Sequence, residues 1–289
     1  MALFSIAQPC AVAVLPTSAA ICNGSSVQLI ASSSNASTNF TWAPSSSVTP
    51  STGDTVSAHP ITTTTYTVSL NGCQPATVVV TVYPNPTANA GNATSVCPGF
   101  GVALNGSASG GQNPYIYSWA PSATLSNANI ASPTASPLSN TTYTLTVHDN
   151  HGCIGTSTVA VTMNAVPTAA FTSSPNNQCS NIPVVFTNTS TGTGLTYQWN
   201  FGDPTSSTNT SSSTNPSHTF SSAIGNGTQT FNVTLITTNS NGCSDTSISQ
   251  IVVNQIPMAT LGGTGAVTYN GLNFFKACTT NTATFTFTN

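Results

Sequence analysis

One short segment of the sequence brings together side chains that could do chemistry. Asp149 lies between His148 and His151, and a carboxylate with two imidazoles is a donor set that can bind zinc. The four residues from Asp149 to Gly152, however, read Asp-Asn-His-Gly between two strand-like runs, and these residue types favour a tight turn. We therefore predict that Asp149 stabilises a turn and that this segment holds no metal.

Asp203 and His218 are two further candidates, each considered by itself. Asp203 could ligate Ca²⁺, but a hard cation needs several oxygen ligands, and no other acidic residue is near Asp203 in sequence. We predict instead that Asp203 accepts backbone N–H groups in a turn and that His218 makes a structural hydrogen bond. Serine is abundant, yet none stands in a Gly-x-Ser-x-Gly elbow, and no His–Asp partnership is visible in the sequence. We predict no catalytic residues, no cofactor and no bound metal.

Charged residues are scarce throughout the chain. The 289 residues include one cation, Lys276, and four acids far apart in sequence, so that 2% are charged, against roughly a quarter in an ordinary soluble domain. One lysine cannot displace the counterions of a nucleic acid or form the basic face of a membrane-surface helix. Apolar runs end too early to span a membrane, and neither carboxylate pairs nor arginine clamps are present. The composition therefore predicts no nucleic-acid binding, no membrane insertion and no enzyme activity.

The cysteines belong to an internal repeat. Three segments share one order: a first Cys, an apolar alternation, a Trp 20 to 22 residues after that Cys, a strand-like run, an Asn-Gly or His-Gly turn, a second Cys, and a run that closes at Pro. Length varies most between the Trp and the later run, which indicates loops on a constant scaffold. The first Cys, Trp and second Cys are Cys22, Trp42 and Cys73, then Cys97, Trp119 and Cys153, then Cys179, Trp199 and Cys243.

The period of these segments is that of β-strands. Tyr143, Leu145 and Val147 alternate with Thr144 and Thr146, which places apolar side chains on one face and hydroxyls on the other. Asn-Gly pairs indicate hairpins, because both residues accept positive φ. We predict an all-β protein, a tandem array of antiparallel β-sandwiches of about seven short strands each, with the Trp of each module in its core.

The eight cysteines predict an oxidising, extracellular setting and one disulfide per module. Each first Cys precedes an alternating strand and each second Cys follows the hairpin turn, so that the bond would staple one end of the sandwich. Closing such a loop contributes about 4 kcal/mol in the chain-entropy model. The alternative is free, buried cysteines. The predicted pairs are Cys22–Cys73, Cys97–Cys153 and Cys179–Cys243.

The two ends of the chain match the repeat only in part. The run after Cys10 is similar to the segment after each second Cys, and the run after Cys278 is similar to the segment after Cys179. We therefore predict the end of a preceding module, three complete modules with proline-stiffened joints, and the start of a further module. These cover residues 1–16, 17–84, 85–166, 167–256 and 257–289.

Two explanations of these ends stay open. If the chain is a complete protomer, residues 257–289 of one copy could pair with residues 1–16 of the next, with Cys278 bonded to Cys10. Such head-to-tail contacts build filaments, and strand addition is a suitable mode of pairing. In the other explanation, the sequence is part of a longer chain.

The third module resembles the PKD (polycystic kidney disease) domain. That family's hallmark is Trp-x-Phe-Gly-Asp followed by Pro-x-His-x-aromatic. The module departs from it at Pro204, where the family usually has Gly, and in a long Ser/Thr-rich loop over residues 205–214. The first two modules lack Phe-Gly-Asp and are similar to immunoglobulin-like repeats. The matching residues are Trp199, Phe201, Gly202, Asp203, Pro216 and His218.

Tandem repeats of this Ser/Thr/Asn-rich, Lys-poor kind are similar to those in large surface adhesins of Bacteroidota that are exported by the type IX system. The resemblance implies a non-enzymatic structural or adhesive rod or filament that is extracellular or on the cell surface. Its partners would be neighbouring modules, copies of itself, or a glycan or other cell-surface ligand. The alternative is a carbohydrate-binding accessory region of a secreted glycoside hydrolase, which would favour exposed aromatic side chains on one face.

Overall fold

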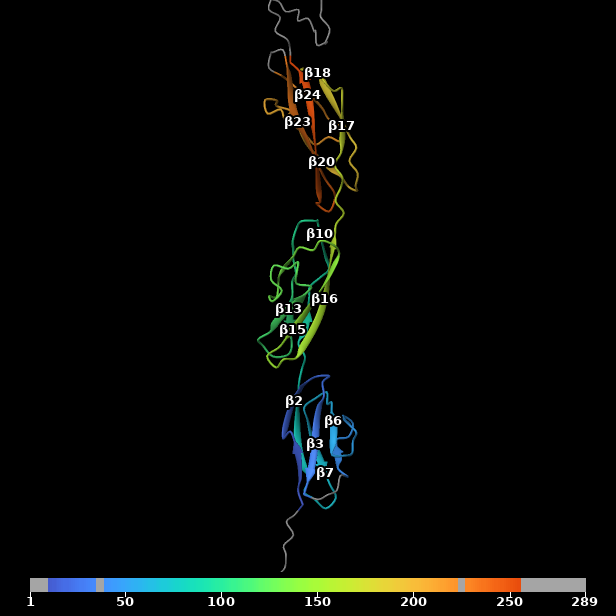
Figure 1. The fold of residues 1–289 in the computed structure, drawn as a ribbon, viewed down its shortest axis with the longest axis vertical. Coiled ribbons are helices and arrows are strands. Elements are labelled where there is room, and N and C mark those ends of the chain that lie inside the picture. Colours follow the sequence, from blue (N-terminus) through green and yellow to red (C-terminus); the bar gives the residue numbers. More distant parts are fainter. Residues whose placement is uncertain (1–9, 35–38, 223–226, 256–289) are drawn as a thin grey trace, which may run out of the picture. The chain divides into compact units, whose positions relative to one another are not determined.

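The computed structural model describes residues 10–34, 39–222 and 227–255, and the regular elements in these ranges are all β-strands (Figure 1). This confirms the predicted fold class. No described segment forms a helix that is long and apolar enough to cross a membrane. The chain divides into two compact units, Met1–Thr162 and Met163–Asn289, of which the first contains two sandwiches and the second contains one.

The first sandwich packs two four-stranded sheets around a core that includes Leu29, Tyr66 and Val80, all 0% exposed. One sheet has the order β1–β3–β6–β5, and its strands are β1 (Val12–Leu15), β3 (Val27–Ser33), β6 (Thr55–Ala58) and β5 (Val48–Thr49). The other has the order β2–β8–β7–β4, and its strands are β2 (Ser18–Cys22), β8 (Ala76–Tyr83), β7 (Thr64–Ser69) and β4 (Thr41–Ala43).

Strand β1 belongs to this first sandwich. It pairs with β3, and Val12 and Val14 are buried in the same core as Leu29. The predicted assignment of residues 1–16 to the end of a preceding module is therefore wrong for β1. The reason is that an alternating apolar run fits the first strand of a sandwich as well as the last, so the pattern alone does not choose between them.

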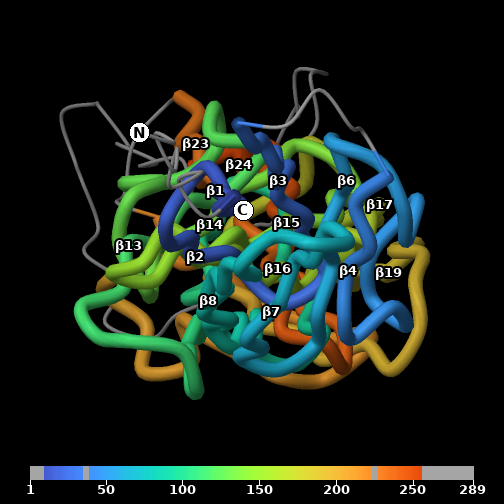
Figure 2. The backbone as a smooth tube through the Cα atoms, turned by 90° about the horizontal axis from the view of Figure 1, so that it is seen from below, coloured from blue at the N-terminus to red at the C-terminus, as the bar shows by residue number. Residues whose placement is uncertain are grey.

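Strand β2 runs parallel to β8, with Cys22 opposite Tyr83. Figure 2 shows β2, β8 and β7 next to one another in the sheet. The other strand pairs of the first sandwich are antiparallel, as their hairpin turns predict. This parallel edge strand decides at which end of the sandwich Cys22 lies.

The second sandwich has one four-stranded sheet and two short two-stranded sheets. The four-stranded sheet has the order β10–β16–β15–β13, with β10 (Thr94–Val96), β16 (Ile154–Met163), β15 (Thr141–His148) and β13 (Ile116–Ala120). The short sheets are β11 (Val102–Ala103) with β14 (Thr134–Ala135), and β12 (Ser107–Ser109) with β9 (Thr87–Asn89). Tyr143, Leu145 and Val147 point into the core and are 0% exposed, which is the alternation that the sequence predicts.

The third sandwich also has two sheets. One has the order β17–β19–β22, with β17 (Phe171–Ser174), β19 (Pro183–Asn188) and β22 (Ser217–Thr219). The other has the order β18–β24–β23–β20–β21, with β18 (Gln178–Cys179), β24 (Ser244–Asn254), β23 (Thr228–Thr238), β20 (Thr196–Asn200) and β21 (Thr210–Ser211). Its core is the most aromatic of the three, because Phe186 packs against Trp199, Phe201 and Phe220. The predicted further module at 257–289 lies outside the described residues.

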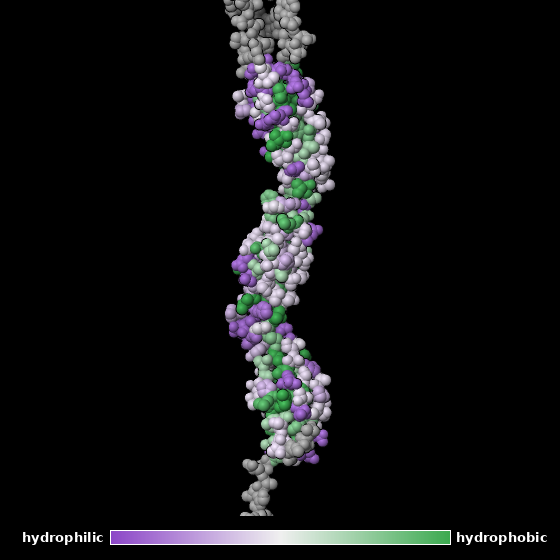
Figure 3. Space-filling view, in the orientation of Figure 1, coloured by the Kyte–Doolittle hydropathy of each residue, from purple (hydrophilic) through white to green (hydrophobic). Residues whose placement is uncertain are grey.

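The three tryptophans occupy equivalent core positions. Trp42, Trp119 and Trp199 are at most 3% exposed, and each indole N–H donates to a backbone oxygen of a later loop. The acceptors are Gly53 at 3.0 Å, Ile130 at 3.1 Å and Ser213 at 2.9 Å. Each Trp therefore fills the core and also satisfies its only polar group there. On the face drawn in Figure 3, hydrophobic areas are small and alternate with hydrophilic ones.

Candidate functional site

The disulfides of the first unit differ from the predicted ones. Cys10 is bonded to Cys73, and Cys22 is bonded to Cys153. The predicted pairs Cys22–Cys73 and Cys97–Cys153 are therefore wrong. Because Cys10 is bonded within its own chain, its predicted pairing with Cys278 of another copy is wrong as well. Cys278 lies outside the described residues.

The parallel edge strand explains the first error. Cys22 lies opposite Tyr83, the last residue of β8, whereas Cys73 precedes the first residue of β8. Eight strand residues span about 25 Å, and a disulfide needs Cα atoms within about 7 Å of each other. Cys22 and Cys73 therefore lie at opposite ends of the first sandwich. The Cα atoms of Cys22 and Cys153 are 5.4 Å apart.

The same geometry contradicts the predicted Cys179–Cys243 pair. Strand β18 is parallel to β24, and Cys179 lies opposite Asn254, the last residue of β24. Cys243 directly precedes Ser244, the first residue of that 11-residue strand, so that the two cysteines are about 35 Å apart. Cys97, Cys179 and Cys243 are themselves disulfide-bonded.

The Cys22–Cys153 bond joins the first sandwich to the second, and further contacts surround it. The ring of Tyr83, at the end of β8, stacks on the ring of His151 with a centroid distance of 3.6 Å and an interplanar angle of 10°. The backbone N–H of Asn23 donates to Tyr83 O at 2.9 Å, and Asn85 Nδ2 donates to Asn23 O at 3.0 Å. We call the residues 22–23, 83–86 and 149–155 the joint.

Two glycines of the second sandwich let the linker approach closely. A Cβ on Gly155 would lie 2.1 Å from Pro86 O, and a Cβ on Gly111 would lie 2.7 Å from Asp149 Oδ2 and 3.2 Å from Pro86 N. Any side chain at Gly155 would therefore displace the backbone of the linker. A glycine inside a strand signals such a close approach. This is the feature of the sequence from which the packed linker could have been predicted.

Asp149 fixes the hairpin turn of the joint. Its Oδ1 accepts the backbone N–H groups of His151 and Cys153, both at 2.9 Å, and its Oδ2 accepts the N–H of Gln112 at 3.0 Å. Burial alone would raise the pKa of this carboxyl, but the three N–H donors and the nearby His151 outweigh it, so that the pKa is lowered from 3.8. This is the turn role that the sequence predicts. Among the described residues, no three His, Cys, Asp or Glu side chains gather as a metal site.

The third sandwich has a turn of the same design. Asn239 Oδ1 accepts the backbone N–H groups of Asn241 and Cys243, both at 3.0 Å, and Asn239 Nδ2 donates to Ala165 O at 2.7 Å. Sequence reasoning missed Asn239. The signal was the shared spacing, because Asp149 and Asn239 each stand three residues before Gly and four before Cys. A side chain that accepts from residues two and four positions later is an Asx-type turn.

The structure brings Asp203 and His218 together in the third sandwich, a His–Asp partnership that was not visible in the sequence. His218 Nε2 lies 3.3 Å from Asp203 Oδ2, and both side chains are at most 1% exposed. The ring of Phe201 stacks on His218 with a centroid distance of 4.4 Å. Asp203 Oδ1 accepts the hydroxyl of Thr205 at 2.8 Å, so that its partners are a hydroxyl and an imidazole rather than the predicted backbone N–H groups. Pro216 is buried two residues before His218, and its carbonyl oxygen accepts the backbone N–H of Phe186 at 2.9 Å.

The backbone conformation explains why this motif has a glycine at position 202. Its φ is +70°, and a Cβ there would lie 2.4 Å from Asn232 O. Only glycine combines this backbone conformation with such a close approach. The Phe-Gly-Asp turn therefore folds tightly onto β23 and carries Asp203 towards His218.

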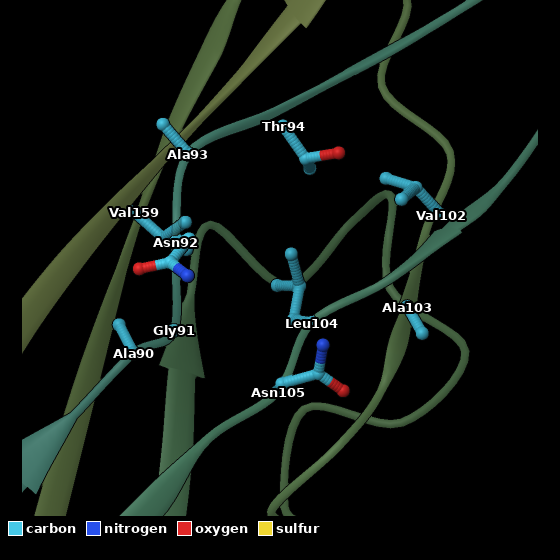
Figure 4. A pocket seen from close by; sticks show the side chains of 10 residues that line it. All are labelled: Ala90, Gly91, Asn92, Ala93, Thr94, Val102, Ala103, Leu104, Asn105 and Val159. Carbon is cyan, nitrogen blue, oxygen red and sulfur yellow. The ribbon is translucent and has the colours of Figure 1, made fainter.

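The second sandwich has a hollow of about 480 Å³, lined by residues 90–94, residues 102–105 and Val159 of β16. Figure 4 shows Leu104 at its centre, with Asn92 and Asn105 beside it. The lining consists of small apolar residues, Thr94 and these two amides, with no acid, base or nucleophilic pair. The hollow therefore offers no arrangement for acid–base or nucleophilic chemistry.

Comparison with known proteins identifies the third sandwich. Residues 164–253 match the family model of the PKD domain, which confirms the predicted resemblance of this module. Domains of this kind and immunoglobulin-like repeats are typically non-catalytic. A search of curated proteins gives no match.

Three solved structures illustrate the similarity. The PKD1 domain of the Vibrio cholerae metalloprotease PrtV is 26% identical over 32% of this chain and 100% of that chain, with a TM-score of 0.25. A structure of carbohydrate-binding modules from the β-sandwich superfamily is 26% identical over 32% of this chain and 36% of that chain, with a TM-score of 0.27. Titin domains I67–I69 are 12% identical over 87% of this chain and 99% of that chain, with a TM-score of 0.38.

Proposed function

We propose that this chain is a segment of an extracellular, non-enzymatic rod or filament with a structural or adhesive role. The observation that carries the proposal is the Cys22–Cys153 bond, which joins one sandwich covalently to the next. A chain whose sandwiches act independently gains nothing from such a bond, whereas a load-bearing or spacing element gains a fixed joint. Disulfides also favour an oxidising environment outside the cytosol.

The rest of the joint supports the same proposal. The stacked rings of Tyr83 and His151 and the close contact of Gly155 with Pro86 leave the linker little freedom. Flexible linkers between independent domains are rich in Gly and Ser and are not packed in this way. The nearly uncharged Thr-, Ser- and Asn-rich surface gives little electrostatic repulsion between copies and therefore suits assembly.

We further propose that the protein is a surface adhesin of the kind that Bacteroidota export by the type IX system, with a glycan, another cell-surface ligand or further copies as partners. Antibodies against the chain should label intact cells of the organism that carries it. Deletion of the gene should reduce attachment of these cells to surfaces or to each other. Labelling that appears only after permeabilisation would exclude the proposed location.

Assembly through residues 1–16 and 257–289 is a separate part of the proposal. Since Cys10 is bonded to Cys73, a head-to-tail contact would have to use other groups of these segments. Electron microscopy of the purified chain, with its disulfides kept oxidised, should then show filaments. A monomer at high concentration by light scattering would remove this part and leave the structural role intact.

The rival function, a carbohydrate-binding accessory region of a glycoside hydrolase, requires an aromatic platform on the surface. The three tryptophans are at most 3% exposed and each is used in a core. A glycan array with the full chain tests the rival directly. Retention on a polysaccharide would support it and, because an adhesin can also bind glycans, cell labelling would then distinguish the two.

A further inference from the structure

Two extended segments of the first unit are joined end to end by one disulfide. From Cys10 the chain runs through β1 and β2 to Cys22, and from Cys153 it runs directly into β16. The bond between Cys22 and Cys153 connects the end of the first segment to the beginning of the second. The shortest covalent route from Cys10 to Thr162 therefore passes through these two segments and leaves out everything between Cys22 and Cys153.

This short route has almost no slack. Strand residues rise about 3.3 Å each, and a fully stretched chain reaches only about 3.3–3.6 Å per residue. Because β1, β2 and β16 are strands, the route is close to its maximum length before any force acts on it. The rest of the two sandwiches lies on the longer route, which follows the backbone from Cys22 to Cys153 instead of crossing the disulfide. This route is 131 residues longer than the short one.

We propose that tension along the chain passes through β1, β2, the Cys22–Cys153 bond and β16, so that the first two sandwiches bear load without unfolding. The taut route would reach its limit before the long route is stretched, and the cores around Trp42 and Trp119 would not be pulled apart. This inference rests on the proposed structural role, which it deepens by assigning the load to particular strands and to one bond.

The second disulfide has a different part in this mechanism. Cys10–Cys73 shortens the route through the first sandwich by 63 residues, because it connects the entry of the chain to the start of β8. It offers no shortcut through the second sandwich. Between Cys10 and Thr162 the route through Cys22–Cys153 is shorter, so that removal of Cys10–Cys73 alone should leave the load path unchanged.

Single-molecule force spectroscopy on the full chain tests the inference. Azide-bearing residues at the exposed positions Ala11 and Thr162 would hold the handles, so that all eight cysteines keep their native state. The oxidised chain should show no unfolding step between the handles. The Cys10→Ser/Cys73→Ser variant, which removes one disulfide in the same sandwich, is the matched control and should also show none.

Removal of Cys22 and Cys153 should expose the hidden length. Cys97→Ser is added to every variant so that the disulfide of Cys97 offers no other route. In the Cys22→Ser/Cys153→Ser variant the remaining shortcut is then Cys10–Cys73. The route between the handles lengthens from 20 residue steps (11 to Cys22 and 9 from Cys153) to 90 (1 to Cys10 and 89 from Cys73), a gain of 70 residues or about 240 Å. After reduction of every disulfide in the wild-type chain, the gain should be that of 131 residues, about 450 Å.

A contour-length gain of more than about 100 Å in the oxidised wild-type chain, a length that roughly 30 residues would span, would overturn the inference. A gain in the Cys10→Ser/Cys73→Ser control equal to that of Cys22→Ser/Cys153→Ser would do the same, because the two bonds would then be equivalent. The wild-type measurement needs no variant to fold. Its failure would not affect the proposed surface location, which cell labelling tests separately.

Discussion

The hairpin turns of the second and third sandwiches share one design and differ in one atom. In both, an Asx side chain accepts from the backbone N–H groups two and four positions later, at 2.9 Å for Asp149 and 3.0 Å for Asn239. The other terminal atom meets opposite partners. Asp149 Oδ2 faces a donor, the N–H of Gln112, whereas Asn239 Nδ2 faces an acceptor, Ala165 O.

The donor opposite Asp149 Oδ2 explains why a charged residue stands at position 149 in a chain that has few charges. A carboxylate can accept at both oxygens, while an amide accepts at one end and donates at the other. The two N–H donors within the turn can be bound by either Asp or Asn. The choice between Asp and Asn therefore depends on the partner outside the turn, which is the N–H of Gln112 for residue 149 and Ala165 O for residue 239. Exchanging the two residues should damage both turns for opposite reasons.

The largest effect should come from Asn239→Asp. The new carboxylate would face Ala165 O in place of a donated hydrogen bond at 2.7 Å, and residue 239 is only 9% exposed. Leaving a charged buried group without its partner costs roughly 2–4 kcal/mol. Hydrogen exchange, followed by mass spectrometry, should show reduced protection of β23 and β24 and unchanged protection of the second sandwich.

Acidic conditions supply the control for this variant. Once protonated, the carboxyl that the Asn239→Asp variant carries can donate to Ala165 O, so that protection of β23 and β24 should recover towards wild type as the pH falls. If the loss of protection were the same at low and neutral pH, charge at residue 239 would not be its cause. Thr246→Ser, at an exposed position of β24, should have little effect at any pH.

The reciprocal change, Asp149→Asn, should have a smaller effect. The amide can still accept from His151 and Cys153, but its NH₂ group would then face the N–H of Gln112, which loses its acceptor. The N–H of Gln112 is only partly buried, so that its loss of an acceptor should cost about 1 kcal/mol, the low end of the range for an unsatisfied buried donor. Protection of the backbone amide of residue 112 should fall most, and a wild-type value there would show that the carboxylate is not required.

The two turns should also differ in their response to acid. Because the pKa of Asp149 is lowered in the folded chain, its contribution to stability is complete above the ordinary value of 3.8 and is lost as the pH falls through the lower folded value. Asn239 does not titrate. Between about pH 5 and pH 2, protection factors of residues 151 and 153 should fall relative to those of 241 and 243. Asp149→Asn should remove this difference.

The strands could be predicted from the sequence because their signals are local. Tyr143, Leu145 and Val147 alternate, and the turn after them has the residue types of a hairpin, so β15 and β16 follow from neighbours in sequence. The role of Asp149 was predicted for the same reason. The partners of Asp203 were not predicted: Thr205 donates its hydroxyl where backbone N–H groups were expected, and His218, 15 residues away in sequence, becomes a neighbour only through the fold.

The disulfides could not be predicted because they depend on strand direction. A first Cys beside a strand and a second Cys after a turn would be close if both strands ended at the same end of the sandwich. Strand β2 is parallel to β8, which sends Cys22 to the other end, next to Tyr83. No periodicity in the sequence reports the direction of an edge strand, and the assignment of Cys10 to an earlier module failed for a related reason.

The smallest expected loss of stability comes from a substitution in the core of the second sandwich. Tyr143 in the second sandwich is 0% exposed and its hydroxyl shares a hydrogen bond of 2.6 Å with Thr124 Oγ1, while the corresponding residue of the third sandwich, Phe231, packs on Phe220. Tyr143→Phe should cost about 1 kcal/mol, the net value of one hydrogen bond. A double-mutant cycle with Thr124→Ala measures it by chemical unfolding of the second sandwich. A coupling energy near zero would mean that the hydrogen bond of the Tyr143 hydroxyl does not stabilise the second sandwich. A Phe at this position would then pack equally well in both cores.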